Sequence, residues 1–102
     1  LDNWIILYVF LELSLIKDLG YDPNLGQFKK NKPEGDFQKI KIDTFIYDAP
    51  LYLIQNKIPT NLSKNLIKAS LNFTRSIIHN RFFLPNNLSF PKSRILLEKY
   101  YS

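Results

Sequence analysis

Basic side chains recur along one face of a predicted helix in the second half of the chain. Lys64, Lys68 and Arg75 follow one another at steps of four and seven residues, His79 comes four residues later, and no acidic residue interrupts them. Residues at such steps share one helix face, where ammonium and guanidinium groups can bind phosphates or the carboxylates of an acidic peptide. A solvated helix surface has the same pattern, so this alternative stays open. The candidate anion-binding residues here and just beyond are Lys64, Lys68, Arg75, Arg81 and Arg94.

The charge of the chain is divided unevenly between its two halves. Residues 1–48 hold six Lys/Arg and eight Asp/Glu, whereas residues 49–102 hold eight Lys/Arg and one Asp/Glu, within a net charge of +5. Such asymmetry suggests an anionic partner for the second half. From charge alone, a basic surface kept for solubility accounts for the pattern equally well.

The chain offers few groups for catalysis. It has no cysteine, one histidine and three scattered glycines. The lack of cysteine excludes disulfides, thiolate metal sites and a cysteine nucleophile, and the glycines form no phosphate-binding loop. No serine lies in a motif typical of a nucleophile, and His79 is expected to be a surface residue. We therefore predict a non-enzymatic protein without a metal or a cofactor.

The basic stripe needs a helix to hold it, and the sequence predicts one at about 61–83. Apolar residues recur there at steps of three and four and make one broad face opposite the stripe. They include Leu62, Leu66, Ala69, Phe73 and Ile77. A last helix is predicted at 90–100, because Pro91 is tolerated in a first helical turn.

The most apolar stretch of the chain lies near its beginning. Between residues 4 and 16 only Glu12 and Ser14 are not apolar. A helix that is apolar on nearly every side is expected to be buried on nearly every side, and the run is shorter than the roughly 20 residues of a membrane span. We therefore predict a central buried helix at 3–19, ended by Gly20 in a left-handed conformation.

Glu12 is the unusual residue of this central helix. An ionised carboxylate inside a core is costly unless a cation pairs with it. We predict a buried or half-buried ion pair with Arg94 or Arg75, the alternative being an acid that binds a partner.

One strand signal completes the fold. In the stretch 37–47, Ile40, Ile42 and Ile46 alternate with polar residues, which predicts a short strand or hairpin arm with these isoleucines on one face. We expect this element to lie outside the helical core.

The elements together predict a mainly α fold, a small helical bundle around a buried central helix, with a minor β-strand or hairpin at about 37–47. A chain of this length forms a single domain, 1–102.

Two stretches of the chain carry a recognisable signature. Residues 10–21 read Phe-Leu-Glu-Leu-Ser-Leu-Ile-Lys-Asp-Leu-Gly-Tyr, and residues 88–94 read Leu-Ser-Phe-Pro-Lys-Ser-Arg after the run at 79–85. The first resembles the Phe-Glu-x-x-Leu-Leu-x-x-Leu-Gly-Tyr motif that opens the helical domain of the RecO family. The second resembles the tail of the alphaproteobacterial branch, with Phe-Pro-x-Ser-Arg where that branch has Leu-Pro-x-Ala-Arg. Order and spacing agree over residues 5–31 and 60–98, and the middle is not diagnostic.

Two features of the RecO family are missing from this chain. Many members carry a four-cysteine zinc knuckle after the first helix, whose first pair would fall near Phe28 and Asn31, and neither side chain can replace a thiolate. The N-terminal OB-fold barrel of the family is also absent. Because the chain opens on Leu1 and holds no methionine, we expect it to be an excised domain or the C-terminal part of a longer protein.

The resemblance implies a non-enzymatic role in DNA repair and homologous recombination. RecO proteins act with RecR to help RecA replace single-stranded DNA-binding protein, and their helical domain binds the acidic, Phe-ended tail of that protein. The expected partners are this tail, RecR and single-stranded DNA, the last bound weakly without the barrel, in a bacterial cytoplasm and without a membrane. The alternative is a small basic helical adaptor, unrelated to DNA repair, that binds another acidic protein.

Overall fold

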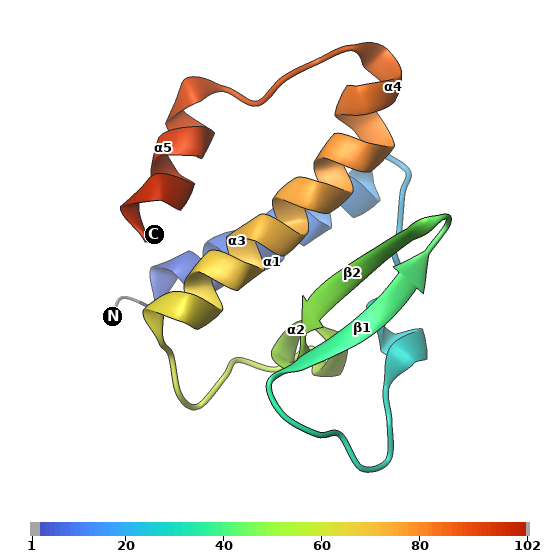
Figure 1. The fold of residues 1–102 in the computed structure, drawn as a ribbon, viewed down its shortest axis with the longest axis vertical. Helices are drawn as coiled ribbons and strands as arrows, with labels where there is room; N and C mark the ends of the chain where they lie inside the picture. The colour runs from blue at the N-terminus through green and yellow to red at the C-terminus, as the bar shows by residue number, and fades with distance from the viewer. Residues whose placement is uncertain (1–2, 102) are drawn as a thin grey trace.

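Figure 1 shows the fold in a computed structural model of the protein, which describes residues 3–101. The α-helices are α1 (Trp4–Asp18), α2 (Leu51–Gln55), α3 (Lys64–Ile78), α4 (Leu84–Asn86) and α5 (Lys92–Tyr100). The other elements are the short helical segments η1 (Leu25–Phe28) and η2 (His79–Phe83) and the strands β1 (Phe37–Ile42) and β2 (Phe45–Pro50). The two strands pair into one antiparallel sheet, so the prediction of a mainly α domain with a minor hairpin is confirmed.

The end of α1 follows from its sequence. Gly20 has a φ of +96°, a conformation that costs a residue with a Cβ more than it costs glycine. The N–H of Gly20 donates to the carbonyl of Lys17 at 3.0 Å, and the N–H of Tyr21 donates to the carbonyl of Ile16 at 3.2 Å. This pair of hydrogen bonds is a Schellman motif, so Gly20 ends α1 with the positive φ that was predicted.

The predicted long helix is shifted along the sequence. It begins at Lys64 rather than at 61, because the Ser63 side chain accepts a hydrogen bond from the N–H of Leu66 at 3.1 Å and caps the helix. It then continues without a break through η2 and α4 (Figure 1). η2 is a π-helical segment, and it lies just before Pro85, whose ring would crowd a carbonyl of a regular helix.

The hairpin belongs to the core, contrary to its expected place outside it. β2 packs on α3, where the ring of Tyr47 meets the ring of Phe73 edge to face with 5.8 Å between centroids. Asn80 also donates a hydrogen bond to the hydroxyl of Tyr47 at 3.0 Å. Ile40 and Ile42 are buried on the same side of the sheet. Aromatic and β-branched residues on one face of this small sheet therefore help to close the core.

Ile46 does not share the face of Ile40 and Ile42. It pairs with Lys41 across the hairpin and is 69% exposed, whereas Ile42 pairs with Phe45. A residue and its cross-strand partner lie on the same side of a sheet. The single alternation predicted over 37–47 is therefore wrong beyond Ile42, because the two-residue turn at 43–44 changes which side chains face the core.

α1 is covered on one side only, so the prediction of a helix buried on nearly every side is wrong. Its inner residues are buried and include Ile5, Ile6, Val9 and Ile16. Its outer row of large apolar side chains is exposed to between 49% and 70%: Trp4, Leu7, Leu11, Leu15 and Leu19. α1 lies behind α3 in Figure 1, and the remaining elements are too few to surround it. Among the described residues, no helix is both long enough and apolar enough to cross a membrane.

Candidate functional site

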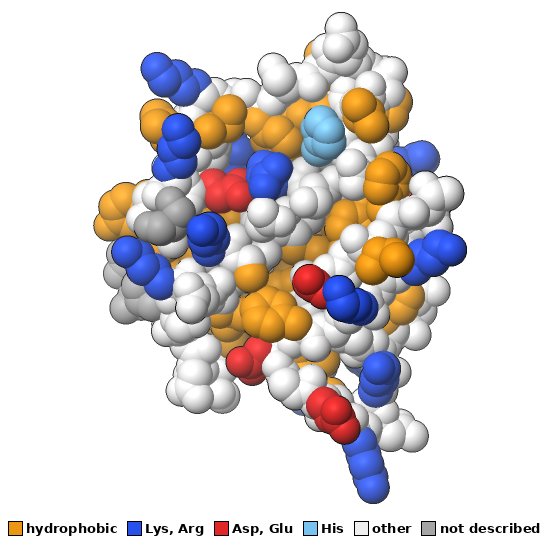
Figure 2. All heavy atoms as spheres, viewed as in Figure 1, with side chains coloured by type: hydrophobic (Ala, Val, Ile, Leu, Met, Phe, Trp, Pro, Cys, Tyr) orange, Lys and Arg blue, Asp and Glu red, His pale blue; other side chains and the backbone are white. Residues whose placement is uncertain are grey.

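A groove between α3 and α5 combines an apolar wall with a basic rim. Its cavity has a volume of about 460 Å³. Leu88, Phe90 and Ile95 supply apolar side chains, and Lys68 and Arg75 from α3 supply positive charge. Figure 2 shows Lys and Arg side chains around patches of apolar surface on this side of the molecule. The groove can therefore receive an apolar group while the charges beside it attract an anion.

The charges of the groove are partly balanced by one acid. Nε of Arg75 donates to the Glu98 carboxylate at 2.8 Å, and the Arg75 side chain is 37% exposed. Lys68, about two turns before Arg75 on α3, is exposed and has no ion-pair partner among residues 3–101. Lys99 and His79 also line the groove. The cations outnumber the single carboxylate, so the site favours an anionic ligand.

The structure places the five candidate residues in different surroundings. Lys68 and Arg75 lie in the groove, and Lys64 is exposed one turn earlier on the same helix face. Arg81 lies elsewhere, with its guanidinium 4.7 Å from the centre of the Tyr21 ring. Arg94 is buried, with a side chain only 6% exposed, so its proposed role in binding a partner does not fit its position.

Arg94 forms the buried ion pair that was predicted for Glu12. Its Nε donates to one carboxylate oxygen at 2.7 Å, and its Nη2 donates to the other at 3.0 Å. Nη2 also donates to the carbonyl of Leu71, and Thr74 donates its hydroxyl to Glu12 at 2.7 Å. Every buried side-chain N or O atom of the described residues has a hydrogen-bond partner. The pair joins α1, α3 and α5 from inside the core.

The ionisation of this network is set by burial and by the partner charges. Burial of the Arg94 guanidinium disfavours its charge, but the hydrogen bonds and the charge of Glu12 outweigh this effect and raise the pKa of Arg94. Burial, followed by the nearby Glu12 carboxylate, also raises the pKa of Tyr8, whose hydroxyl donates to Glu12 at 3.2 Å. Glu98 contacts Arg94 at 3.4 Å as well as Arg75, so this carboxylate links the buried pair to the groove.

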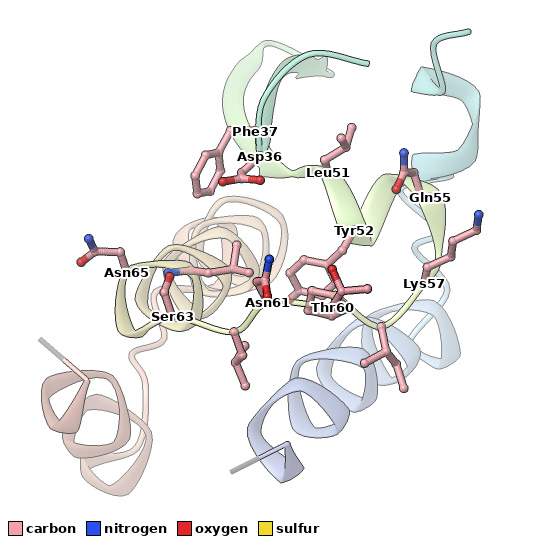
Figure 3. A pocket seen from close by; sticks show the side chains of 14 residues that line it. Asp36, Phe37, Leu51, Tyr52, Gln55, Lys57, Thr60, Asn61, Ser63 and Asn65 are labelled. Carbon is pink, nitrogen blue, oxygen red and sulfur yellow. The ribbon is translucent and has the colours of Figure 1, made fainter. Parts of the chain in front are cut away.

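A larger cavity lies at the other end of α3 (Figure 3), with a volume of about 700 Å³. The base of the hairpin, α2 and the loop before α3 surround it, and the side chains in view include Tyr52, Thr60, Asn61 and Ser63. Tyr52 is already held, because its hydroxyl donates to Ser70 at 2.7 Å. The lining residues include no histidine and only one acid, Asp36. This cavity holds none of the predicted site residues.

The apolar half of the groove was not predicted from the sequence. Phe90 and Ile95 were assigned only to the last helix, predicted at 90–100, and Leu88 was assigned to no element. Within residues 3–101, no group of three or more acidic or histidine side chains is placed to hold a metal ion. The geometry supports binding of an anionic ligand with an apolar end.

No protein-family model matches this chain, and it matches no curated protein and no solved structure.

Proposed function

We propose that this domain is a non-enzymatic docking module that binds an acidic peptide ending in an aromatic residue in the groove between α3 and α5. The observation that carries the proposal is the combination of an apolar wall with a cationic rim in one cavity of about 460 Å³. A cavity of this size lies within the range of roughly 300–1,000 Å³ that is usual for ligand sites. The apolar wall would hold the terminal ring, and the rim would hold the carboxylates before it.

The contacts of the groove suit a ring on the apolar wall and carboxylates on the basic rim. Ile95 and Leu88 are 42% and 57% exposed, so a ring placed on them removes apolar surface from water. Arg75 keeps donors beyond the one that Glu98 occupies, and a guanidinium can bind a second carboxylate through them. Lys64 and Lys68 extend the positive charge along α3 for acidic residues further back in the peptide.

The wider role that we propose follows from the RecO resemblance. The peptide would be the acidic, Phe-ended tail of single-stranded DNA-binding protein, and the domain would act with RecR in DNA repair and homologous recombination. Its location would be the bacterial cytoplasm. Single-stranded DNA would bind weakly through the same exposed lysines, because phosphate contacts depend on positive charge and not on the apolar wall.

A second candidate is a basic adaptor for a different acidic protein. The observation in its favour is that the groove requires only an anion beside an apolar group, which many acidic peptides offer. Such an adaptor would bind its own target more tightly than the Phe-ended tail and would be indifferent to RecR.

The test is fluorescence anisotropy with a labelled acidic peptide that ends in Phe, titrated with the domain at increasing salt. We expect saturable binding that weakens with salt and falls at least about ten-fold, or about 1.4 kcal/mol, when the terminal Phe is removed. Binding that ignores the terminal Phe would contradict the role of the apolar wall. An absence of binding by a folded sample would refute the proposed function.

Two pairs of substitutions separate the parts of the site. Lys64→Glu with Lys68→Glu removes the exposed charge, and Leu88→Ser with Ile95→Ser removes the apolar wall. Charge reversal at Arg75 is avoided, because it would place a second carboxylate beside Glu98. A matched control, Lys30→Glu with Lys41→Glu, changes the net charge equally at exposed positions outside the groove. Both site pairs should lose binding, and the control should keep it.

A further inference from the structure

The exposed row on α1 forms a continuous apolar ridge. Leu7, Leu11, Leu15 and Leu19 follow one another at steps of four residues, with Trp4 before them, and each is about half exposed or more. Side chains at steps of four make the ridges by which helices pack into one another. No α3 or α5 residue covers this row to the extent that the inner side of α1 is covered. Within residues 3–101, α1 has no packing partner on this side.

A groove runs beside this ridge and is lined almost entirely by apolar side chains. Its volume is about 430 Å³. Leu11, Leu15 and Leu19 form one wall, and the other wall includes Phe82 and Leu88. The same surface thus presents a ridge and, next to it, a groove that can receive such a ridge. A surface with both features is complementary to a second copy of itself.

The chemistry of α1 selects an uncharged partner. Between residues 4 and 16 the only Lys, Arg, Asp or Glu of α1 is Glu12, and it is buried in the pair with Arg94. A charged partner would lose hydration on this surface without gaining an opposite charge. α3 and α5 carry charged residues on their outer faces, whereas the charged residues of α1 other than Glu12 lie at its C-terminal end, at Lys17 and Asp18.

We propose that two copies of this protein associate through their α1 ridges, packed antiparallel about a two-fold axis near Leu11. In this arrangement Leu7 of each copy lies against Leu15 of the other, and each ridge enters the groove of the opposite copy. The antiparallel helices place opposite ends of their dipoles together. The basic stripe of α3 faces away, since α1 lies behind α3 in Figure 1 and Lys and Arg side chains populate the front in Figure 2.

The area that a stable dimer buries indicates how much of this surface the interface must include. A standard interface covers about 800 Å² per partner, about a ninth of the 6891 Å² of this domain. The exposed strip of α1 is about 22 Å long and about 10 Å wide, which is too little alone. The interface therefore includes the groove and its far wall at Phe82 and Leu88.

This dimer shares one residue, Leu88, with the proposed peptide site. The basic rim of the α3–α5 groove stays open in both copies, because Lys68 and Arg75 lie on the side of α3 away from its buried residues. Two open grooves on one dimer would strengthen the binding of a partner that displays several tails. Lys64→Glu with Lys68→Glu changes only the peptide site and Leu11→Gln with Leu15→Gln changes only the ridge, so failure of peptide binding and failure of dimerisation are separate results.

The first test is the molar mass of the 102-residue protein by sedimentation equilibrium over about two decades of concentration. We expect twice the monomer mass of 12.1 kDa at the higher concentrations. Leu11→Gln with Leu15→Gln should give a folded monomer. The matched control Ile46→Gln with Ile58→Gln, at exposed positions off the ridge, should remain a dimer. A monomer at every concentration, a broad distribution of larger aggregates, or equal loss in the control would overturn the proposal.

The second test uses the absence of native cysteine. Leu11→Cys places one thiol of each copy beside the proposed axis, so mild oxidation should convert most of the protein into a covalent dimer. Ile46→Cys, on the outer face of the hairpin, should form little covalent dimer under the same conditions. Equal cross-linking of the two variants would show random collision and would overturn the arrangement, even if the molar mass were that of a dimer.

Discussion

The buried ion pair between Glu12 and Arg94 gives the sharpest test of how this domain is held together. Arg94→Met removes both hydrogen bonds to the Glu12 carboxylate, at 2.7 and 3.0 Å, and leaves that carboxylate 8% exposed with Thr74 and Tyr8 as its remaining partners. Leaving one member of a buried pair without the other costs about 3–5 kcal/mol. Because a domain of this size is stable by about 5–15 kcal/mol, the single variant should lose a large part of its stability.

The double variant distinguishes an unpaired charge from lost packing. Glu12→Leu with Arg94→Met replaces two charged side chains by apolar ones of similar length, and no buried carboxylate remains. Replacement of a buried pair in this way is often neutral or stabilising, by up to about 4 kcal/mol. We therefore expect the double variant to be at least as stable as the unmodified protein. Both should be much more stable than either single variant, Arg94→Met or Glu12→Leu.

The assay is urea unfolding followed by circular dichroism, with the free energy of unfolding taken by linear extrapolation. Glu12→Gln, which keeps the shape but not the charge of the acid, should fall among the destabilised single variants, since the buried Arg94 guanidinium would then keep only the longer contact to the Glu98 carboxylate, at 3.4 Å, as an ion pair. If Arg94→Met loses less than about 1 kcal/mol, the pair is as weak as a surface ion pair and the reasoning fails. A double variant as unstable as the sum of the two singles would also refute it.

Three smaller predictions concern the other elements. Burial raises the pKa of Tyr52 to about 12, which links its ionisation to the free energy of unfolding. The neutral hydroxyl contributes about 2–3 kcal/mol relative to the ionised one, and this stability is present below pH 10 and is lost as the pH rises through 12. Tyr52→Phe should therefore reduce the alkaline fall in stability measured by circular dichroism. Ser63→Ala removes the cap of α3 and should cost about 0.5–2 kcal/mol in urea unfolding, whereas Ser14→Ala on the exposed side of α1 should change little. Gly20→Ala should cost about 1 kcal/mol through backbone strain alone, because nothing lies within 4 Å of the added Cβ, and Gly26→Ala, with no positive φ, serves as its control. If Gly20→Ala matched its control, the Schellman turn would not depend on glycine.

Local chemistry determines which parts of the fold were predictable from the sequence. The end of α1 and the pairing of Glu12 depend on residues whose requirements are strong: a glycine at a positive φ, and a buried carboxylate that must find a cation. The apolar face of α3 was equally predictable, because apolar residues at steps of three and four over several turns are typical of an amphipathic helix and not of a strand. Each of these predictions depends either on the sequence of one helix or on one side chain that requires an oppositely charged partner.

The features that were not predicted from the sequence depend on how helices and strands are connected and packed against one another. The face of Ile46 depends on the turn at 43–44, whose two residues change which side chains point to the core. The exposure of Leu11 and Leu15 depends on how many neighbours α1 has, which its own composition does not state. The apolar wall at Leu88 and Ile95 becomes a site only when α5 lies beside the basic face of α3.

Glu98 shows why the candidate site and the core must be tested together. One of its carboxylate oxygens accepts from Nε of Arg75 at 2.8 Å and contacts Nη1 of Arg94 at 3.4 Å. Arg94 therefore holds α5 in place and also positions the acid that orients Arg75 in the groove. A substitution of Arg94 would weaken peptide binding by moving α5, although this side chain is too buried to contact a peptide. Loss of binding in an Arg94 variant is evidence for a contact only if the stability of α5 is shown to be unchanged, whereas the exposed Lys68 carries no such ambiguity.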